Sequence, residues 1–84
     1  MNYQVFLETR AKRELESLPK NVRKQLANVI DDLEKEPRSP GSKKLIQKEG
    51  YRIRKGDYRL LYTIDDKERR VTIYRIGHRR EIYR

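Results

Sequence analysis

The sequence predicts an α+β domain in which an N-terminal strand and an antiparallel helical hairpin precede a three-stranded antiparallel meander, all in one sheet. Apolar residues recur at helical spacing between residues 9 and 37, and the period changes to two beyond residue 50. The alternating stretches are joined by turns too short for a parallel crossover. We therefore expect one domain over residues 1–84, with the hairpin on one face of the sheet and the other face left for a ligand.

The N-terminal half contains the elements of the hairpin. Apolar residues alternate with polar ones over residues 1–7, which predicts a short strand. Thr9 is the expected N-cap of a first helix, which Pro19 ends. The second helix has the strongest periodicity in the chain and ends at Pro37. Its apolar stripe consists of Val22, Leu26, Val29, Ile30 and Leu33.

The C-terminal half contains the meander. Residues 38–42 have the composition of a loop, and residues 51–55 then alternate as a strand does. Further strands are expected over residues 58–65 and 71–77, with polar turns before and between them.

Charge is the second strong signal. The chain has 84 residues, with 22 Lys or Arg against 13 Asp or Glu and a net charge of +9. Residues 1–42 have a net charge of +1, and residues 43–84 have a net charge of +8. Arginine dominates the basic half, and its planar guanidinium suits bidentate contact with phosphate. The expected partner is nucleic acid, with simple solubilisation by surface charge as the alternative.

Composition also excludes several classes of function. The chain has no cysteine and one histidine, so we expect neither a disulfide framework nor a zinc site, and no metal or cofactor. No apolar run has the length of a membrane span, and the N-terminus lacks a signal-peptide pattern. We therefore expect a cytoplasmic protein with no membrane partner.

Several basic side chains are expected to converge at one end of the sheet. Arg52 and Arg54 share one side of a strand, and Arg59 begins the next strand. His78 and Arg79 follow the last strand directly. Taken singly, Arg52 and Arg54 are also compatible with a solvated face, and His78 with an ordinary surface histidine.

Two further residues have plain alternatives of the same kind. Arg59 is compatible with an ion pair to Asp57 or Glu81, and Tyr83 with a terminal aromatic packed on the sheet. The clustering of these groups is what favours a site.

Two sequence blocks, YRIRKGDYRLLY over residues 51–62 and IGHRREIY over residues 76–83, closely resemble the signature blocks of RelE toxins in the RelE/ParE superfamily. Lys44-Leu45 also fits that pattern. The resemblance spans nearly the whole chain and implies the toxin of a type II toxin–antitoxin system. It implies cleavage of mRNA in the ribosomal A site, next to rRNA, which inhibits translation. It further implies a cognate acidic, RelB-like antitoxin that forms a hetero-oligomer with the toxin.

The resemblance also implies roles for particular residues. Arg59 is similar to the family's phosphate-facing arginine, Arg79 to the arginine that follows Gly-His or Gly-Lys, and Tyr83 to a tyrosine that stacks on a base near the cut. These three and His78 form the expected catalytic set. The expected RNA-binding residues are Lys44, Arg52, Arg54 and Arg80.

The departures from the family pattern bear on mechanism. Arg52, Arg54 and His78 stand where the best-studied member has lysines. Arginine does not lose its proton in proteins, so Arg52 and Arg54 should act as electrostatic clamps and not as bases. Histidine titrates near neutral pH, so we expect His78 to be the general base or general acid when the 2′-hydroxyl attacks the phosphate. Glu49 and Glu81 are weaker candidates.

Two other functions remain open. The ParE branch shares the fold and inhibits DNA gyrase without cutting RNA, although the ending over residues 76–83 resembles a nuclease site. A non-catalytic RNA-binding domain explains the charge but not the cluster of His78, Arg79 and Tyr83.

Overall fold

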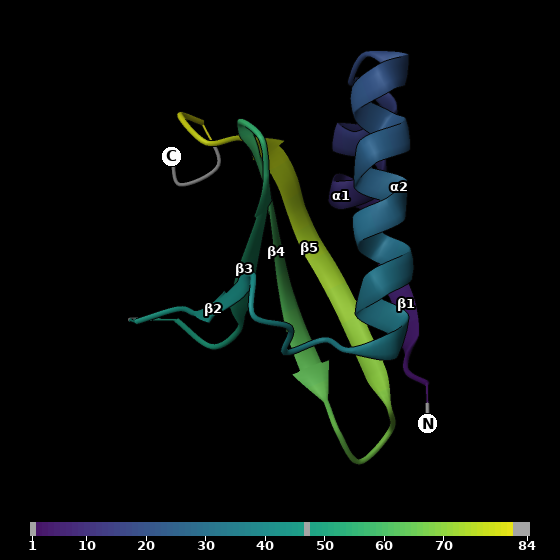
Figure 1. Ribbon diagram of the computed structural model, residues 1–84, viewed down its shortest axis with the longest axis vertical. Helices are drawn as coiled ribbons and strands as arrows, with labels where there is room; N and C mark the ends of the chain where they lie inside the picture. The colour runs from purple at the N-terminus through teal and green to yellow at the C-terminus, as the bar shows by residue number, and fades with distance from the viewer. Residues whose placement is uncertain (1, 47, 82–84) are drawn as a thin grey trace.

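The computed structural model describes residues 2–46 and 48–81. Figure 1 shows both helices on one side of a twisted sheet. The elements are, in chain order, β1 (Gln4–Leu7), α1 (Thr9–Glu16), α2 (Lys20–Lys35), β2 (Ser42–Lys44), β3 (Tyr51–Lys55), β4 (Tyr58–Asp65) and β5 (Arg70–His78). The α+β class is confirmed.

The sheet has five strands in the order β1-β5-β4-β3-β2. The pairs β2–β3, β3–β4 and β4–β5 are antiparallel, as the expected three-stranded meander requires for its own strands. β1 runs parallel to β5, with Val5 opposite Val71. The two helices between β1 and the meander supply the long connection that parallel pairing needs. The sheet is therefore mixed.

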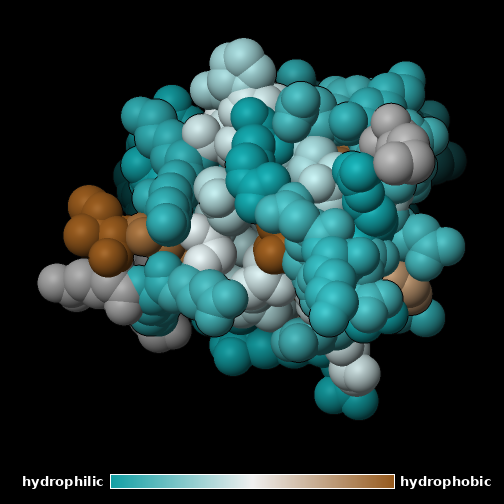
Figure 2. Space-filling view, turned by 90° about the horizontal axis from the view of Figure 1, so that it is seen from below, coloured by the Kyte–Doolittle hydropathy of each residue, from teal (hydrophilic) through white to brown (hydrophobic). Residues whose placement is uncertain are grey.

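The hydrophobic core lies between the helices and the sheet. Helix α2 contributes the buried residues Leu26, Val29 and Leu33, which belong to its apolar stripe. The sheet contributes Leu60, Tyr62, Val71, Ile73 and Ile76, and α1 contributes Ala11. Leu60 and Tyr62 share a face because side chains alternate along β4, so Arg59 and Leu61 point away from the helices. The outer surface is mostly hydrophilic, as Figure 2 shows for the molecule seen from below.

Two sequence predictions about local structure are wrong. Thr9 is the first residue of α1 and not its N-cap, because the extended backbone at Glu8 (φ −64°, ψ 157°) ends the strand segment one residue earlier. Ser42, the last residue of the predicted loop, is instead the first residue of strand β2, which the sequence did not predict and which pairs with β3. β2 is short and polar, so backbone hydrogen bonds to β3 define it and no alternation of apolar residues marks it.

Glu14 of α1 fixes the edge of β5 beyond the end of β1. One carboxylate oxygen accepts a hydrogen bond from the backbone N–H of Ile76 at 2.9 Å. The other accepts one from Nε of Arg75 at 3.1 Å, and this ion pair is largely buried. Glu14 therefore satisfies a strand-edge donor that has no sheet partner there, and it holds the part of β5 that leads to His78.

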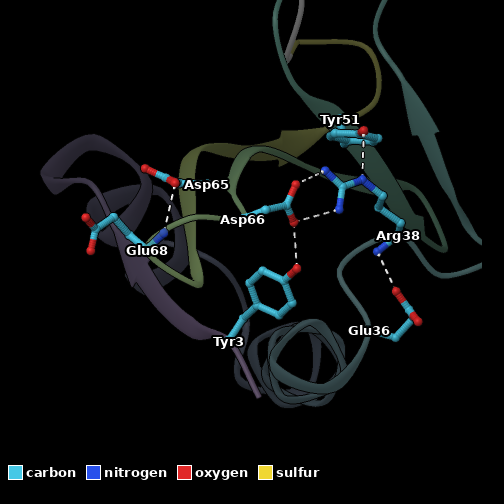
Figure 3. A network of polar contacts seen from close by, with 7 residues as sticks. All are labelled: Tyr3, Glu36, Arg38, Tyr51, Asp65, Asp66 and Glu68. Atoms are coloured by element: carbon cyan, nitrogen blue, oxygen red, sulfur yellow. Dashed lines mark hydrogen bonds and ion pairs between the residues drawn. The ribbon is translucent and has the colours of Figure 1, made fainter. Parts of the chain in front are cut away.

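A second polar cluster ties the chain between α2 and β2 to the turn between β4 and β5 (Figure 3). The guanidinium of Arg38 donates two hydrogen bonds to the carboxylate of Asp66, at 2.9 and 2.8 Å. Tyr3 donates a third to Asp66 at 2.6 Å, and Nε of Arg38 donates to the phenol oxygen of Tyr51 at 3.0 Å. These contacts hold the segment that leads into β2.

Tyr62 holds the same segment from inside the core. Its buried hydroxyl donates to the carbonyl oxygen of Pro37 at 2.6 Å, and its ring stacks on that of Tyr51 with centroids 5.9 Å apart. Burial raises the pKa of the Tyr62 phenol above its ordinary value. The hydroxyl is therefore a stable donor. Within residues 2–46 and 48–81, no helix has both the length and the apolar character to cross a membrane.

Candidate nucleic-acid interface

The sheet face that points away from the helices is basic. Ile53 packs against the core, so its neighbours Arg52 and Arg54 lie on the opposite face of β3. Arg54 is directly opposite Arg59 of β4, and Arg52 is directly opposite Lys43 of β2. Cross-strand partners share a face, so the register brings these four cations together across three strands.

These side chains surround a hollow of about 310 Å³. The residues that line it are Gly41, Lys43, Arg52, Arg54 and Arg59. None of these lining residues is acidic. Arg54 is exposed, whereas Arg52 and Arg59 are half-buried. A concave site with four cations and no carboxylate in its lining has the chemistry of a site for phosphate groups.

Only some of the predicted RNA-binding residues line this hollow. Arg52 and Arg54 line it, as does Arg59 of the predicted catalytic set. Lys44 does not: it lies opposite Tyr51 and therefore on the other face of the sheet. Lys43 lines the hollow, where the sequence predicts Lys44. The sequence does not point to Lys43, because the face on which each lysine lies depends on the register of β2, a strand that was not predicted.

The end of β5 brings His78 next to this face but not onto it. Gly77 is opposite Arg59, and His78 is opposite Tyr58, so the register places His78 and Arg59 on different faces. The imidazole contacts the Tyr58 ring edge-on, with centroids 5.6 Å apart. Its Nδ1 accepts a hydrogen bond from the backbone N–H of Arg80 at 3.2 Å. His78 therefore does not share a face with Arg59, although the two residues belong to neighbouring strands.

Arg79 is tied to the turn between β3 and β4. Its backbone N–H donates to the carbonyl oxygen of Asp57 at 2.8 Å, and its Nε lies 3.8 Å from the Asp57 carboxylate. Figure 1 shows the chain crossing the tip of this turn after β5, toward the side of the sheet away from the helices. The hydrogen bond to Asp57 thus places Arg79 at the turn between β3 and β4, and Arg79 and Arg80 are both exposed.

The remaining candidates have less well-defined places. Tyr83 lies outside the described residues. Glu49 and Glu81 are exposed, and the backbone N–H of Glu81 donates to the carbonyl oxygen of His78 at 2.9 Å. Across the part of the chain that the structure describes, no three His, Cys, Asp or Glu side chains are grouped so that they could hold a metal ion.

Comparisons with known proteins give the family. A family model described as the ParE toxin of the type II toxin–antitoxin system parDE matches residues 5–83. Toxin RelG of Mycobacterium tuberculosis is 40% identical over 89 aligned positions, which cover 100% of this chain and 99% of RelG. This chain is a RelE-type toxin of the RelE/ParE superfamily.

Solved structures of RelE toxins resemble this RelE-type toxin over nearly its whole length. The toxin–antitoxin complex RelBE2 of M. tuberculosis matches with a TM-score of 0.85 and 34% identity, covering 93% of this chain and 99% of that one. The archaeal RelE–RelB complex of Pyrococcus horikoshii matches with a TM-score of 0.83 and 30% identity, covering 96% and 99%. The intact RelBE complex of Escherichia coli matches with a TM-score of 0.80 and 28% identity, covering 90% and 95%.

Proposed function

We propose that this RelE-type toxin is a ribosome-dependent endoribonuclease that cuts mRNA in the A site and so inhibits translation. The observation that carries the proposal is the hollow lined by Lys43, Arg52, Arg54 and Arg59. Its cations come from three adjacent strands and surround a space of the right charge for a phosphodiester. The relatives named RelE and RelG support the same branch of the superfamily.

The reaction assigned to this site is attack of the 2′-hydroxyl oxygen on the adjacent phosphorus. That oxygen forms a new bond to phosphorus and gives up its proton to water, the bond from phosphorus to the 5′-oxygen breaks, and the 5′-oxygen leaves with a proton taken from water. Negative charge accumulates on the phosphorane oxygens in the transition state. Arg59, from the half-buried part of the hollow, and Arg79, from the segment after β5, are assigned to stabilise that charge. Tyr83 is assigned to orient a neighbouring base.

Arg52, Arg54 and Lys43 are assigned to hold the flanking phosphates. Neither arginine can serve as a base, since the guanidinium keeps its proton. The hollow therefore binds and polarises the phosphate, and proton transfer is assigned to water, because His78 lies on the other face of the sheet from Arg59. Metal is not part of the proposed reaction.

An acidic antitoxin is the proposed partner, and the complex is a toxin–antitoxin hetero-oligomer. The related RelE structures from M. tuberculosis and P. horikoshii are complexes with RelB or its counterpart. The net charge of +9 favours an acidic segment that would cover the basic face. Binding to the folded toxin alone would also stabilise it, by about 4 kcal/mol when the partner is at 1,000 times its Kd.

The test uses purified toxin with ribosomes that carry a defined mRNA. We expect one cut in the A-site codon, no cut in the same mRNA without ribosomes, and no cut once the antitoxin is added. A ParE-like function predicts the reverse: intact mRNA and loss of gyrase supercoiling at the same toxin concentration. The family model named after ParE makes that second assay a necessary control.

A further inference from the structure

Leu61 is a buried apolar residue on the basic face of the sheet. Its relative exposure is 3%, although it points away from the helices and does not belong to the core that the helices and the sheet enclose. Its direct cross-strand partner on β3 is Arg52, which lines the hollow. Direct partners share a face, and their Cβ atoms are about 5 Å apart. A leucine that is buried on a polar face needs long neighbouring side chains to cover it.

Arg52 and Arg54 form a matched pair that shows what Leu61 does to an arginine beside it. Both lie on the same face of β3, two residues apart. Arg52, opposite Leu61, is half-buried, whereas Arg54, opposite Arg59, is exposed. The methylene stem of an arginine lies along apolar surface while its guanidinium stays in water. The difference in exposure is the one expected if the stem of Arg52 lies on Leu61.

The arginine on the other side of Leu61 is already paired within the fold. Leu61 is opposite Arg75 of β5, and Nε of Arg75 lies 3.1 Å from the carboxylate of Glu14 on α1. This ion pair is largely buried, and Arg75 is not among the residues that line the hollow. Of the two direct partners of Leu61, Arg52 is therefore the one that can serve a ligand.

We propose that Leu61 is a positioning residue of the hollow: it supports the stem of Arg52, so that the guanidinium is ordered before RNA binds. This inference rests on the proposed function. Immobilising a long side chain during binding costs affinity, and ordering it in the free protein removes that cost. Leu61 carries no charge and is assigned no contact with RNA. Its effect on binding should therefore be separable from that of the cations themselves.

The order of the arginine side chains can be measured without RNA. In ¹⁵N-labelled free toxin, we expect the heteronuclear NOE of the Nε–H groups to show restricted motion for Arg52 and free motion for Arg54. Leu61→Ala should make Arg52 as mobile as Arg54, whereas Leu61→Met keeps the apolar volume and should leave Arg52 restricted. Lys43→Ala, which truncates the partner of Arg52 on β2, should also leave it restricted. An Arg52 that is mobile in the parent, or still restricted in Leu61→Ala, would overturn the proposal.

Binding of single-stranded RNA across a salt series separates positioning from charge. By fluorescence anisotropy, Leu61→Ala should weaken binding by about 2–10-fold at each salt concentration, which is the cost of ordering one long side chain. The slope of log K against log salt should stay parental, because no cation is lost, whereas Arg52→Ala should reduce the slope by about 0.7. In the double variant the loss should equal that of Arg52→Ala alone. Additive losses would mean that Leu61 does not act through Arg52.

A general loss of packing is controlled by Leu33→Ala, which makes the same truncation in the core on α2. At a temperature where circular dichroism shows each variant folded, Leu33→Ala should bind RNA as the parent does, and equal weakening would contradict a positioning role. If Leu61→Ala does not fold, Leu61→Val makes the same comparison with a smaller truncation. A parent that does not cleave mRNA on ribosomes would overturn the proposed function, whereas unchanged motion of Arg52 with cleavage intact would overturn only the role of Leu61.

Discussion

Arg54 and Arg59 are direct cross-strand partners, so two guanidinium side chains lie opposite each other on one face of the sheet. Like charges in such a position destabilise a sheet. Arg52 and Lys43 repeat the arrangement on the next strand pair. A site that gathers cations in this way is suited to an anion that relieves their repulsion. Such an arrangement is expected at a site where binding of an anion matters more than the stability of the sheet.

Neutralising Arg54 should therefore separate stability from activity. In Arg54→Gln we expect the free energy of unfolding to rise by about 0.2–1 kcal/mol, because a like-charge pair is removed. Cleavage on ribosomes should fall, since a phosphate contact is lost. Urea unfolding and the ribosome assay measure the two effects. A less stable variant that cleaves at the parental rate would show that Arg54 has a structural role.

Arg59 should matter more than Arg80, although each substitution by alanine removes one positive charge. Arg59 is half-buried in the lining of the hollow, whereas Arg80 is exposed and is not one of the lining residues. We expect Arg59→Ala to slow single-turnover cleavage by about 10²–10³-fold, as loss of a transition-state donor does. Arg80→Ala should cost only a few-fold. Equal losses would mean that charge acts diffusely and that the hollow is not a defined site.

Lys43 and Lys44 provide a matched pair of neighbours on opposite faces of β2. Lys43 lines the hollow, and Lys44 lies opposite Tyr51 on the other face. We expect Lys43→Ala to weaken binding of single-stranded RNA and to reduce the slope of log K against log salt by about 0.7. Lys44→Ala should change the slope by less. Fluorescence anisotropy across a salt series measures both, and identical slopes would contradict the assignment of the face.

The contact between Arg38 and Asp66 should make stability depend on pH in the acid range. Hydrogen bonds from Arg38, and then from Tyr3, lower the pKa of the Asp66 carboxyl to about 2. An unfolded aspartate has a pKa of about 3.9. The stabilisation is therefore fully present above that value and is lost as the pH falls toward 2. Thermal melts should show Asp66→Asn below the parent at pH 7 with the gap closing by pH 2. A gap that does not change with pH would argue against this linkage.

Local patterns in the sequence predict much of the fold. The stripe on α2 becomes the helical side of the core, and the alternation in β4 gives the correct split between Leu60 and Tyr62 on one face and Arg59 on the other. These patterns depend on residues close together in the chain. Helical spacing and strand alternation report them directly.

The rest depends on long-range pairing, which no local pattern reports. β2 is three polar residues long and forms only because β3 provides its hydrogen-bond partners. The face of Lys43 and the position of His78 opposite Tyr58 follow from register. The contact from Arg38 to Asp66 joins residues 28 apart, and Glu14 contacts the backbone of Ile76 62 residues away. These relationships decide which cations meet in the hollow.

The central claim is that the toxin cuts RNA on ribosomes through the hollow lined by Arg59. Mapping of 5′ ends in cells that express the toxin tests this claim most directly. The matched arm is Arg59→Ala, expressed at the same level. For the parent we expect new 5′ ends inside codons of translated transcripts and none in untranslated regions, with these ends greatly reduced for Arg59→Ala. Growth arrest by the parent with no new 5′ ends, or the same ends from Arg59→Ala, would contradict the account.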